Sequence, residues 1–293
     1  MTDTTPRPTP ESSRTPRWRF AAFWVLLAAL LFLRFGETPE TFLYPVTAFG
    51  DVVGENATHE IHIFAVGVLA WVTVAAVLMQ LRRPASQVAA AWAITLTAVL
   101  PTAPWIMFTD LALTDLPEEL TVIVAIVIGI AVLAFFSHPS SLRAKVTPVA
   151  QRSVVLFALT ALAAIPLFVY AVGQFGIHLD SGPGDEHWAW GHWILMAAFV
   201  MLAVVYGLLA AARVSGWRFA LWAAGLQVAA LGIASLGITA VSQLSTPWAV
   251  LAILWGVVFI VVGELEARRD DPRSARQASG RSADTAVAHR VDG

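Results

Sequence analysis

The chain of 293 residues contains no cysteine. This absence excludes disulfide bonds, thiolate metal sites, cysteine nucleophiles and the CxxCH attachment of haem. Charged residues are also scarce: Asp, Glu, Lys and Arg make up 13% of the sequence, whereas soluble domains average about a quarter. Lysine occurs once, as Lys145. A chain this poor in charge is typical of a protein that is solvated largely by lipid.

Catalytic and nucleic-acid-binding motifs are missing as well. No glycine-rich phosphate loop follows a strand pattern, and no Ser–His–Asp or Ser–Lys arrangement is recognisable. The loops between apolar runs are too short to hold a nucleotide-hydrolysing domain. Nothing beyond the arginines of the C-terminal tail supports nucleic-acid binding, so we expect none.

What the sequence does contain is long apolar runs, with 58% hydrophobic residues and a mean hydropathy of +0.71. A helix needs about 20 apolar residues to cross the hydrocarbon core, and helices are the default because each span must satisfy its own backbone hydrogen bonds. The sequence therefore predicts an all-α integral membrane protein of about eight transmembrane helices. The predicted spans are 18–35, 60–81, 87–109, 118–137, 152–175, 190–212, 217–242 and 246–264.

Basic and acidic residues separate to opposite sides of these spans. One side holds the basic loop residues Arg82, Arg83, Arg143, Lys145, Arg152, Arg213 and Arg218. The other side holds Arg34 and the acids Glu37, Glu40, Asp51, Glu55, Glu60, Asp110, Asp115, Glu118, Glu119, Asp180, Asp185 and Glu186. Because cytoplasmic loops are enriched in arginine and lysine, we expect a protein of the cell (inner) membrane with both termini in the cytoplasm.

The chain divides into four predicted parts. Residues 1–16 and 267–293 are polar and cannot bury a core, so they are expected to be a disordered cytoplasmic N-terminal segment and a disordered tail. Residues 17–146 and 147–266 would form two membrane halves of four helices each.

A weak internal repeat relates these halves at an offset of 130 residues (192 − 62). The pairs that carry it are His62 with His192, Arg83 with Arg213, and Trp92 with Trp222. Four helices per half give both halves the same direction, which predicts a 4+4 parallel repeat about an axis along the membrane normal. The alternative is a chance alignment of two hairpins rich in alanine and leucine.

Histidines gather on the predicted outer side, as His59, His62, His178, His187 and His192. His59 and His62 are three residues apart and share a helix face. If the halves pack about the axis, His62 and His192 face each other. Imidazoles beside carboxylates suit Zn, Cu, Ni or Fe, and facing histidines suit haem as axial ligands.

We therefore predict His62 and His192 as ligands of a haem or a transition metal, with His59 and His187 completing a metal site. The open alternative is a structural role, because histidine is common between helix ends and lipid headgroups.

The layout resembles heme A synthase in its eight helices, its 4+4 repeat and its histidines at the outer ends of the second and sixth helices. Glu55 and His59 have the Glu-x-x-x-His spacing of that family. The resemblance implies haem ligands in the fourth and eighth helices too, but 118–137 and 246–264 contain no histidine. Two haem sites, one within each half, are therefore not expected, and only one shared site is compatible with the sequence.

Two further functions stay open. A small-solute permease would use a cavity lined by Gln227, Ser235 and Thr239, although the same residues also suit hydrogen bonding between helices. A non-catalytic assembly or structural factor would belong to a larger membrane complex or a homo-oligomer. The sequence does not decide whether the protein is an enzyme; an enzyme would be a haem- or metal-dependent membrane oxidoreductase.

Overall fold

The computed structural model describes residues 17–35, 39–48, 57–82, 84–108, 118–138, 152–182 and 185–270, and all regular secondary structure within them is helical. The elements are α1 (Arg17–Phe35), η1 (Pro39–Phe42), α2 (Tyr44–Thr47), α3 (Ala57–Arg82), η2 (Pro84–Ser86), α4 (Val88–Phe108), α5 (Glu118–Ser137), α6 (Val154–Ser181), α7 (Glu186–Ala189), α8 (His192–Ala211), α9 (Trp217–Gly237) and α10 (Thr246–Arg269). The predicted N-terminal segment 1–16 lies outside the described residues. The tail was predicted over 267–293, but residues 267–269 belong to α10, and 271–293 lie outside the described residues.

A helix lies at each of the eight predicted positions, and several of them have the length and apolarity of a membrane span. Among the described residues, 5 helices qualify: residues 59–81 of α3, together with α6, α8, α9 and α10. In α4 and α5, the apolar stretches whose side chains the structure describes are Val88–Pro101 and Ile126–Ser137. The predicted all-α fold with helices of membrane-spanning length is therefore confirmed, whereas the number of spans remains a prediction.

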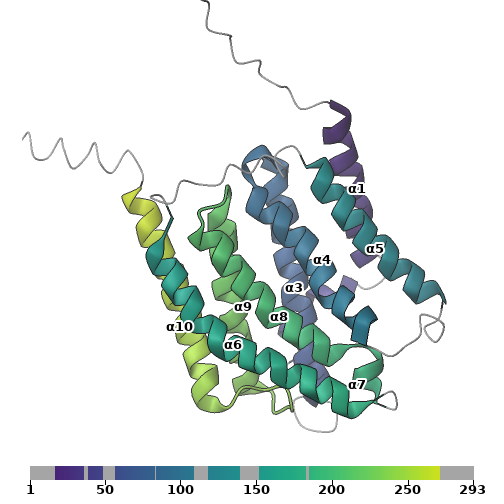
Figure 1. Cartoon of the computed structure of the whole chain (residues 1–293), viewed down its shortest axis with the longest axis vertical. Helices are drawn as coiled ribbons and strands as arrows, with labels where there is room; N and C mark the ends of the chain where they lie inside the picture. The colour runs from purple at the N-terminus through teal and green to yellow at the C-terminus, as the bar shows by residue number, and fades with distance from the viewer. Residues whose placement is uncertain are drawn as a thin grey trace, which may run out of the picture.

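The long helices lie side by side with their connections at the two ends of the bundle (Figure 1). Helices α3, α4, α8 and α9 form the centre, α1 packs on α5 at one edge, and α6 and α10 pack on α8 and α9 at the other. We call the end where α3 and α8 begin the histidine end. The opposite end, where α8 ends and α9 begins, is the arginine end.

The outer helices expose apolar rather than polar side chains. The central helix α8 buries 72% of its most apolar stretch, but α6 and α10 bury only 28% of theirs. Phe157, Ile165 and Phe168 of α6 and Leu251 and Leu254 of α10 are all exposed. A water-soluble protein rarely leaves so much apolar surface uncovered. These faces fit hydrocarbon as the surrounding solvent.

Small residues bring α9 and α10 into backbone contact. A Cβ added to Gly256 would meet the backbone oxygen of Gly225, and one added to Gly232 would meet that of Ala249. Because lipid tails are as apolar as leucine, helices associate in membranes through such close packing rather than through a hydrophobic driving force.

At the arginine end, α8, α9 and α10 are joined by ion pairs. Arg213 pairs with Glu266 at 2.6 Å, and Arg218 pairs with Glu264. The Arg213 guanidinium also lies 3.9 Å from the ring centroid of Trp217. These contacts link α8, α9 and α10 at the arginine end of the bundle.

His138, which the sequence places in a loop, is fully buried at the arginine end. Its Nε2 lies 3.1 Å from Oε1 of Gln80, whose own Nε2 donates to the backbone oxygen of Gln87. Burial lowers the pKa of His138 to about 4, and the charge of Arg19 acts in the same direction, against a hydrogen bond to the backbone of Pro84 that raises it.

The contact between α9 and α10 predicts that Gly256→Leu destabilises the bundle by about 1–3 kcal/mol, the usual effect of overpacking. Thermal unfolding in detergent micelles would measure the loss. Gly173→Leu is the matched control, because a Cβ there has no neighbour within 4 Å. Equal behaviour of the two variants would contradict the close packing.

The burial of His138 predicts that the free energy of unfolding falls as the pH is lowered. Below pH 6.5 the unfolded chain takes up a proton at this residue, whereas the folded protein does so only near pH 4, so stability falls between these values. The difference amounts to at most about 3 kcal/mol. His138→Gln removes this term, so its midpoint of thermal unfolding should fall less than that of the unsubstituted protein between pH 6.5 and pH 4.

Candidate metal centre

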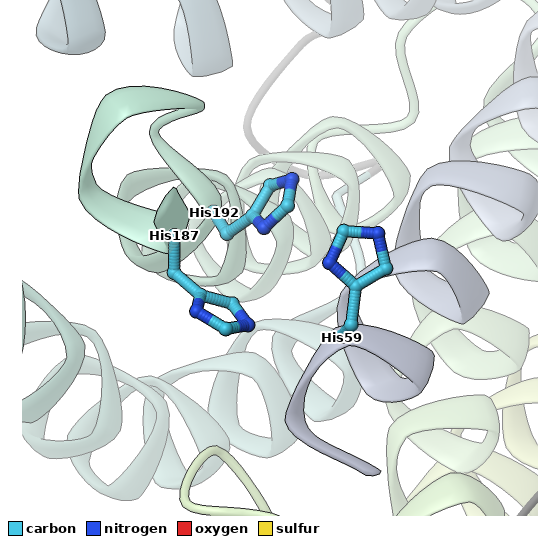
Figure 2. Close-up of side chains that lie close together, drawn as sticks. All are labelled: His59, His187 and His192. Atoms are coloured by element: carbon cyan, nitrogen blue, oxygen red, sulfur yellow. The ribbon is translucent and has the colours of Figure 1, made fainter. Parts of the chain in front are cut away.

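Three histidines converge at the histidine end. His59 lies in the first turn of α3, His187 in α7, and His192 at the start of α8. One ring nitrogen of each lies within 4.8 Å of the others. The ring centroids are 4.9 Å, 5.5 Å and 5.8 Å apart, and Figure 2 shows the three rings around a common space. We call these residues the histidine trio.

A tight turn brings two members of the trio together. His187 and His192 are five residues apart, and the chain between them reverses through Gly191, whose φ of 64° is left-handed. Glycine adopts this conformation without the strain that a Cβ causes. The Gly191 carbonyl then accepts a hydrogen bond from the Leu195 N–H at 2.9 Å, which begins α8 directly after the turn.

Asp185 holds His187 in place. Its Oδ1 accepts hydrogen bonds from the backbone N–H groups of His187 at 2.7 Å and Trp188 at 3.2 Å, and so caps α7. The same oxygen lies 3.3 Å from Nδ1 of His187. Nδ1 is therefore occupied, and Nε2, which is buried and has no hydrogen-bond partner among the described residues, is left for a ligand. A carboxylate behind a histidine is the usual arrangement in metal sites.

His62 lies directly beside the trio and is almost fully buried, with 1% of its surface exposed. Its ring centroid is 5.1 Å from that of His192 and 5.5 Å from that of His187. The structure thus brings together all four predicted ligands, His62 with the trio. His62 is not itself among the three residues whose ring nitrogens converge within 4.8 Å.

A hydrogen-bonded chain fixes the proton of His62. The Ser242 hydroxyl donates to Oε1 of Gln174 at 2.8 Å, so it accepts from the Nε2–H of His62 at 2.9 Å. The Tyr170 hydroxyl donates to the backbone oxygen of Ser242 at 2.6 Å. Nδ1 of His62 therefore carries a lone pair; it is buried and has no hydrogen-bond partner in the described part of the chain.

Ser242 reaches His62 because α9 ends earlier than predicted. The predicted span 217–242 placed Ser242 inside a helix, but α9 ends at Gly237 and Ile238 is extended. Side chains replace the lost helical hydrogen bonds: Ser235 Oγ accepts from the Leu244 N–H at 3.0 Å. Apolar composition continues past Gly237, so hydropathy alone could not locate this end.

Trp193 covers the inner side of the cluster. Its ring centroid lies 4.9 Å from that of His62 and 5.4 Å from that of His187. The indole Nε1–H is buried and has no acceptor among the residues that the structure describes. Leaving a buried polar group unpaired typically costs about 1–3 kcal/mol, so such a group beside a histidine cluster requires an explanation.

Other residues of the predicted cluster lie elsewhere. His178 is buried in α6, which continues past the predicted end at 175, and it stacks on Trp188 with ring centroids 5.5 Å apart. Asp180 is exposed, and Glu55 lies outside the described residues. Asp185 is thus the predicted acid that the structure pairs with a histidine of the trio.

Two of the three polar residues considered for a permease form hydrogen bonds within the bundle, whereas Thr239 is exposed. Gln227 Nε2 donates to the backbone oxygen of Phe199 at 2.6 Å, and Ser235 accepts from Leu244. A cavity of about 260 Å³ lies between α4, α6 and α8. Its lining is apolar and shares no residue with the trio: Leu100, Phe168, Ala171, Val172, Phe175, Ile194, Ala197, Ala198 and Met201.

Sequence reasoning missed Ser242 and Gln174. They are 180 and 68 residues from their partners His62 and Ser242, and no spacing pattern connects them. From sequence, Trp188, Trp190 and Trp193 suit either anchoring at the predicted outer interface or the lining of a ligand pocket beside His187 and His192.

Comparisons of the chain with protein-family models, with curated proteins and with solved structures found no match.

Proposed function

We propose that the chain is a multi-pass membrane protein that binds one transition metal ion through His59, His187 and His192. The observation that carries this proposal is the convergence of three ring nitrogens within 4.8 Å. Ligands of a tetrahedral centre with metal–nitrogen bonds of about 2 Å are about 3.3 Å apart, so small side-chain rotations complete the site. Imidazole ligands without thiolate suit Zn, Cu, Ni or Fe.

The geometry favours a metal ion over a haem. A haem would require a flat macrocycle between its two axial imidazoles. The ring centroids of His62 and His192 are 5.1 Å apart, and the ring centroid of His187 lies 5.5 Å from each of them. Imidazole rather than open space fills the region that the macrocycle would need.

We also propose that the site lies between the halves of a 4+4 parallel repeat. Repeat-related segments meet at both ends of the bundle: His62 packs against His192, and the Ser215 hydroxyl donates to the backbone oxygen of Ser86 at 2.8 Å. The outermost helices depart from the repeat, because α1 packs on α5 whereas α6 packs on α8.

Contacts within the halves also support this repeat. In the first half, the Thr95 hydroxyl lies 3.4 Å from the backbone oxygen of Ala131. In the second half, Gly225 approaches the Ile260 side chain. The offset of 130 residues places Thr95 on Gly225, and it places Ala131 one residue from Ile260.

The metal site predicts that detergent-purified protein binds one equivalent of Co²⁺ or Zn²⁺. His59→Ala and His187→Ala should each abolish stoichiometric binding, because two imidazoles remain. Asp185→Asn should weaken binding by about 10–100-fold, the usual effect of removing an outer carboxylate. Elemental analysis and isothermal titration calorimetry measure these changes.

His178→Ala is the matched control, since it removes a buried histidine of the same end that is not in the trio. It should leave the stoichiometry unchanged. A protein that binds no metal, or whose binding survives both trio substitutions, would refute the proposal.

The proposed orientation places the histidine end outside the cytoplasm. The absence of cysteine allows single labelling sites to be introduced. Gln243→Cys at the histidine end should react with a membrane-impermeant maleimide in intact cells, and Arg269→Cys at the arginine end only after permeabilisation. The reverse pattern would overturn the assignment of both termini to the cytoplasm.

A further inference from the structure

Two unpaired groups beside the histidine trio are complementary to each other. His62 Nδ1 is a buried acceptor, because its Nε2–H is committed to Ser242. Trp193 Nε1–H is a buried donor. Their rings are in contact, with centroids 4.9 Å apart, and both rings also pack against His187. One small molecule that both donates and accepts a hydrogen bond would satisfy the two groups at once.

The histidine trio leaves one coordination position of the proposed metal ion open for such a molecule. Three protein ligands plus one exchangeable ligand form the typical catalytic zinc site, whereas structural sites have four protein ligands. No carboxylate among the described residues joins the three ring nitrogens within 4.8 Å of one another. Asp185 is already used by His187 and two backbone N–H groups.

We infer that the metal ion keeps an open fourth position for a small protic ligand such as water or hydroxide, which donates to His62 Nδ1 and accepts from Trp193 Nε1–H. This inference rests on the metal site proposed above and deepens it. A bound water at such a position is polarised by the metal and becomes a stronger acid. The arrangement therefore belongs to a centre that binds and activates a ligand, not to one that only holds helices together.

The Trp193 donor and the His62 acceptor make the open position selective between protic and aprotic ligands. An aprotic anion such as azide accepts a hydrogen bond from Trp193 but has no proton for His62, so the His62 lone pair opposes it. Removing the donor should therefore weaken azide binding, and removing the acceptor should strengthen it. A purely structural role for the two residues does not predict opposite directions.

The experiment uses the full chain in detergent, loaded with Co²⁺, whose visible absorption reports coordination. The first measurement is the binding of one equivalent of Co²⁺. The second is an azide titration, which should change the spectrum saturably as azide replaces water. Without Co²⁺ binding, the metal site itself is wrong. With Co²⁺ binding but no response to azide, only the open position is wrong.

The variants test the two neighbours. Trp193→Phe should weaken azide binding several-fold, about the effect of one hydrogen bond, and Trp190→Phe is the matched control at an exposed tryptophan of the same turn. His62→Leu should tighten azide binding by a similar factor.

Because His62 is buried, His62→Leu carries a risk of misfolding, and Ser242→Ala gives a second test with the ring retained. It frees Nε2, so the proton can move to Nδ1 and turn the acceptor into a donor, which should also tighten azide binding. Weakening by both His62→Leu and Ser242→Ala would overturn the inference. So would a Cu²⁺ electron paramagnetic resonance spectrum that shows four coordinated imidazoles.

Discussion

Hydrocarbon offers no hydrogen bonds, and this constraint decides where the polar side chains of the bundle lie. Inside the bundle, buried polar side chains bond singly to neighbouring helices, as when Gln227 donates to the backbone of α8 and Thr97 bonds to Tyr206 at 2.8 Å. Among the described residues, the histidine trio and the Arg–Glu pairs lie at the two ends of the bundle. The arginine end holds Arg–Glu ion pairs, and the histidine end holds a cluster of imidazoles, so the two ends differ in chemistry as well as in position.

The helices were predictable from sequence because a run of about 20 apolar residues in lipid has few other solutions. Their limits were less predictable. α6 continues through His178 to Ser181, and α9 stops at Gly237 although apolar residues follow. Hydropathy measures the solvent preference of side chains, whereas a helix end depends on which partners can receive the backbone groups, and those partners are distant in sequence.

The candidate site was predictable in part. His59 and His62 follow from their spacing on one helix, and the offset of 130 residues brought His192 into the prediction. The different roles of the histidines did not follow. Only the fold shows that His62 is tied to Ser242, whereas His187 is oriented by Asp185. The hydrogen-bond partners that distinguish these histidines are set by tertiary packing. No local sequence pattern shows them.

The hydrogen bonds from His62 through Ser242 to Gln174 span three separate parts of the chain: α3, the segment after α9, and α6. α6 packs on α8, whose first residue is a member of the trio. A shift of α6 would therefore alter both the orientation of His62 and the position of His192. For the proposed metal ion, thermodynamic linkage makes any such coupling reciprocal: a change in the packing of α6 that alters metal affinity is itself favoured or opposed by metal binding.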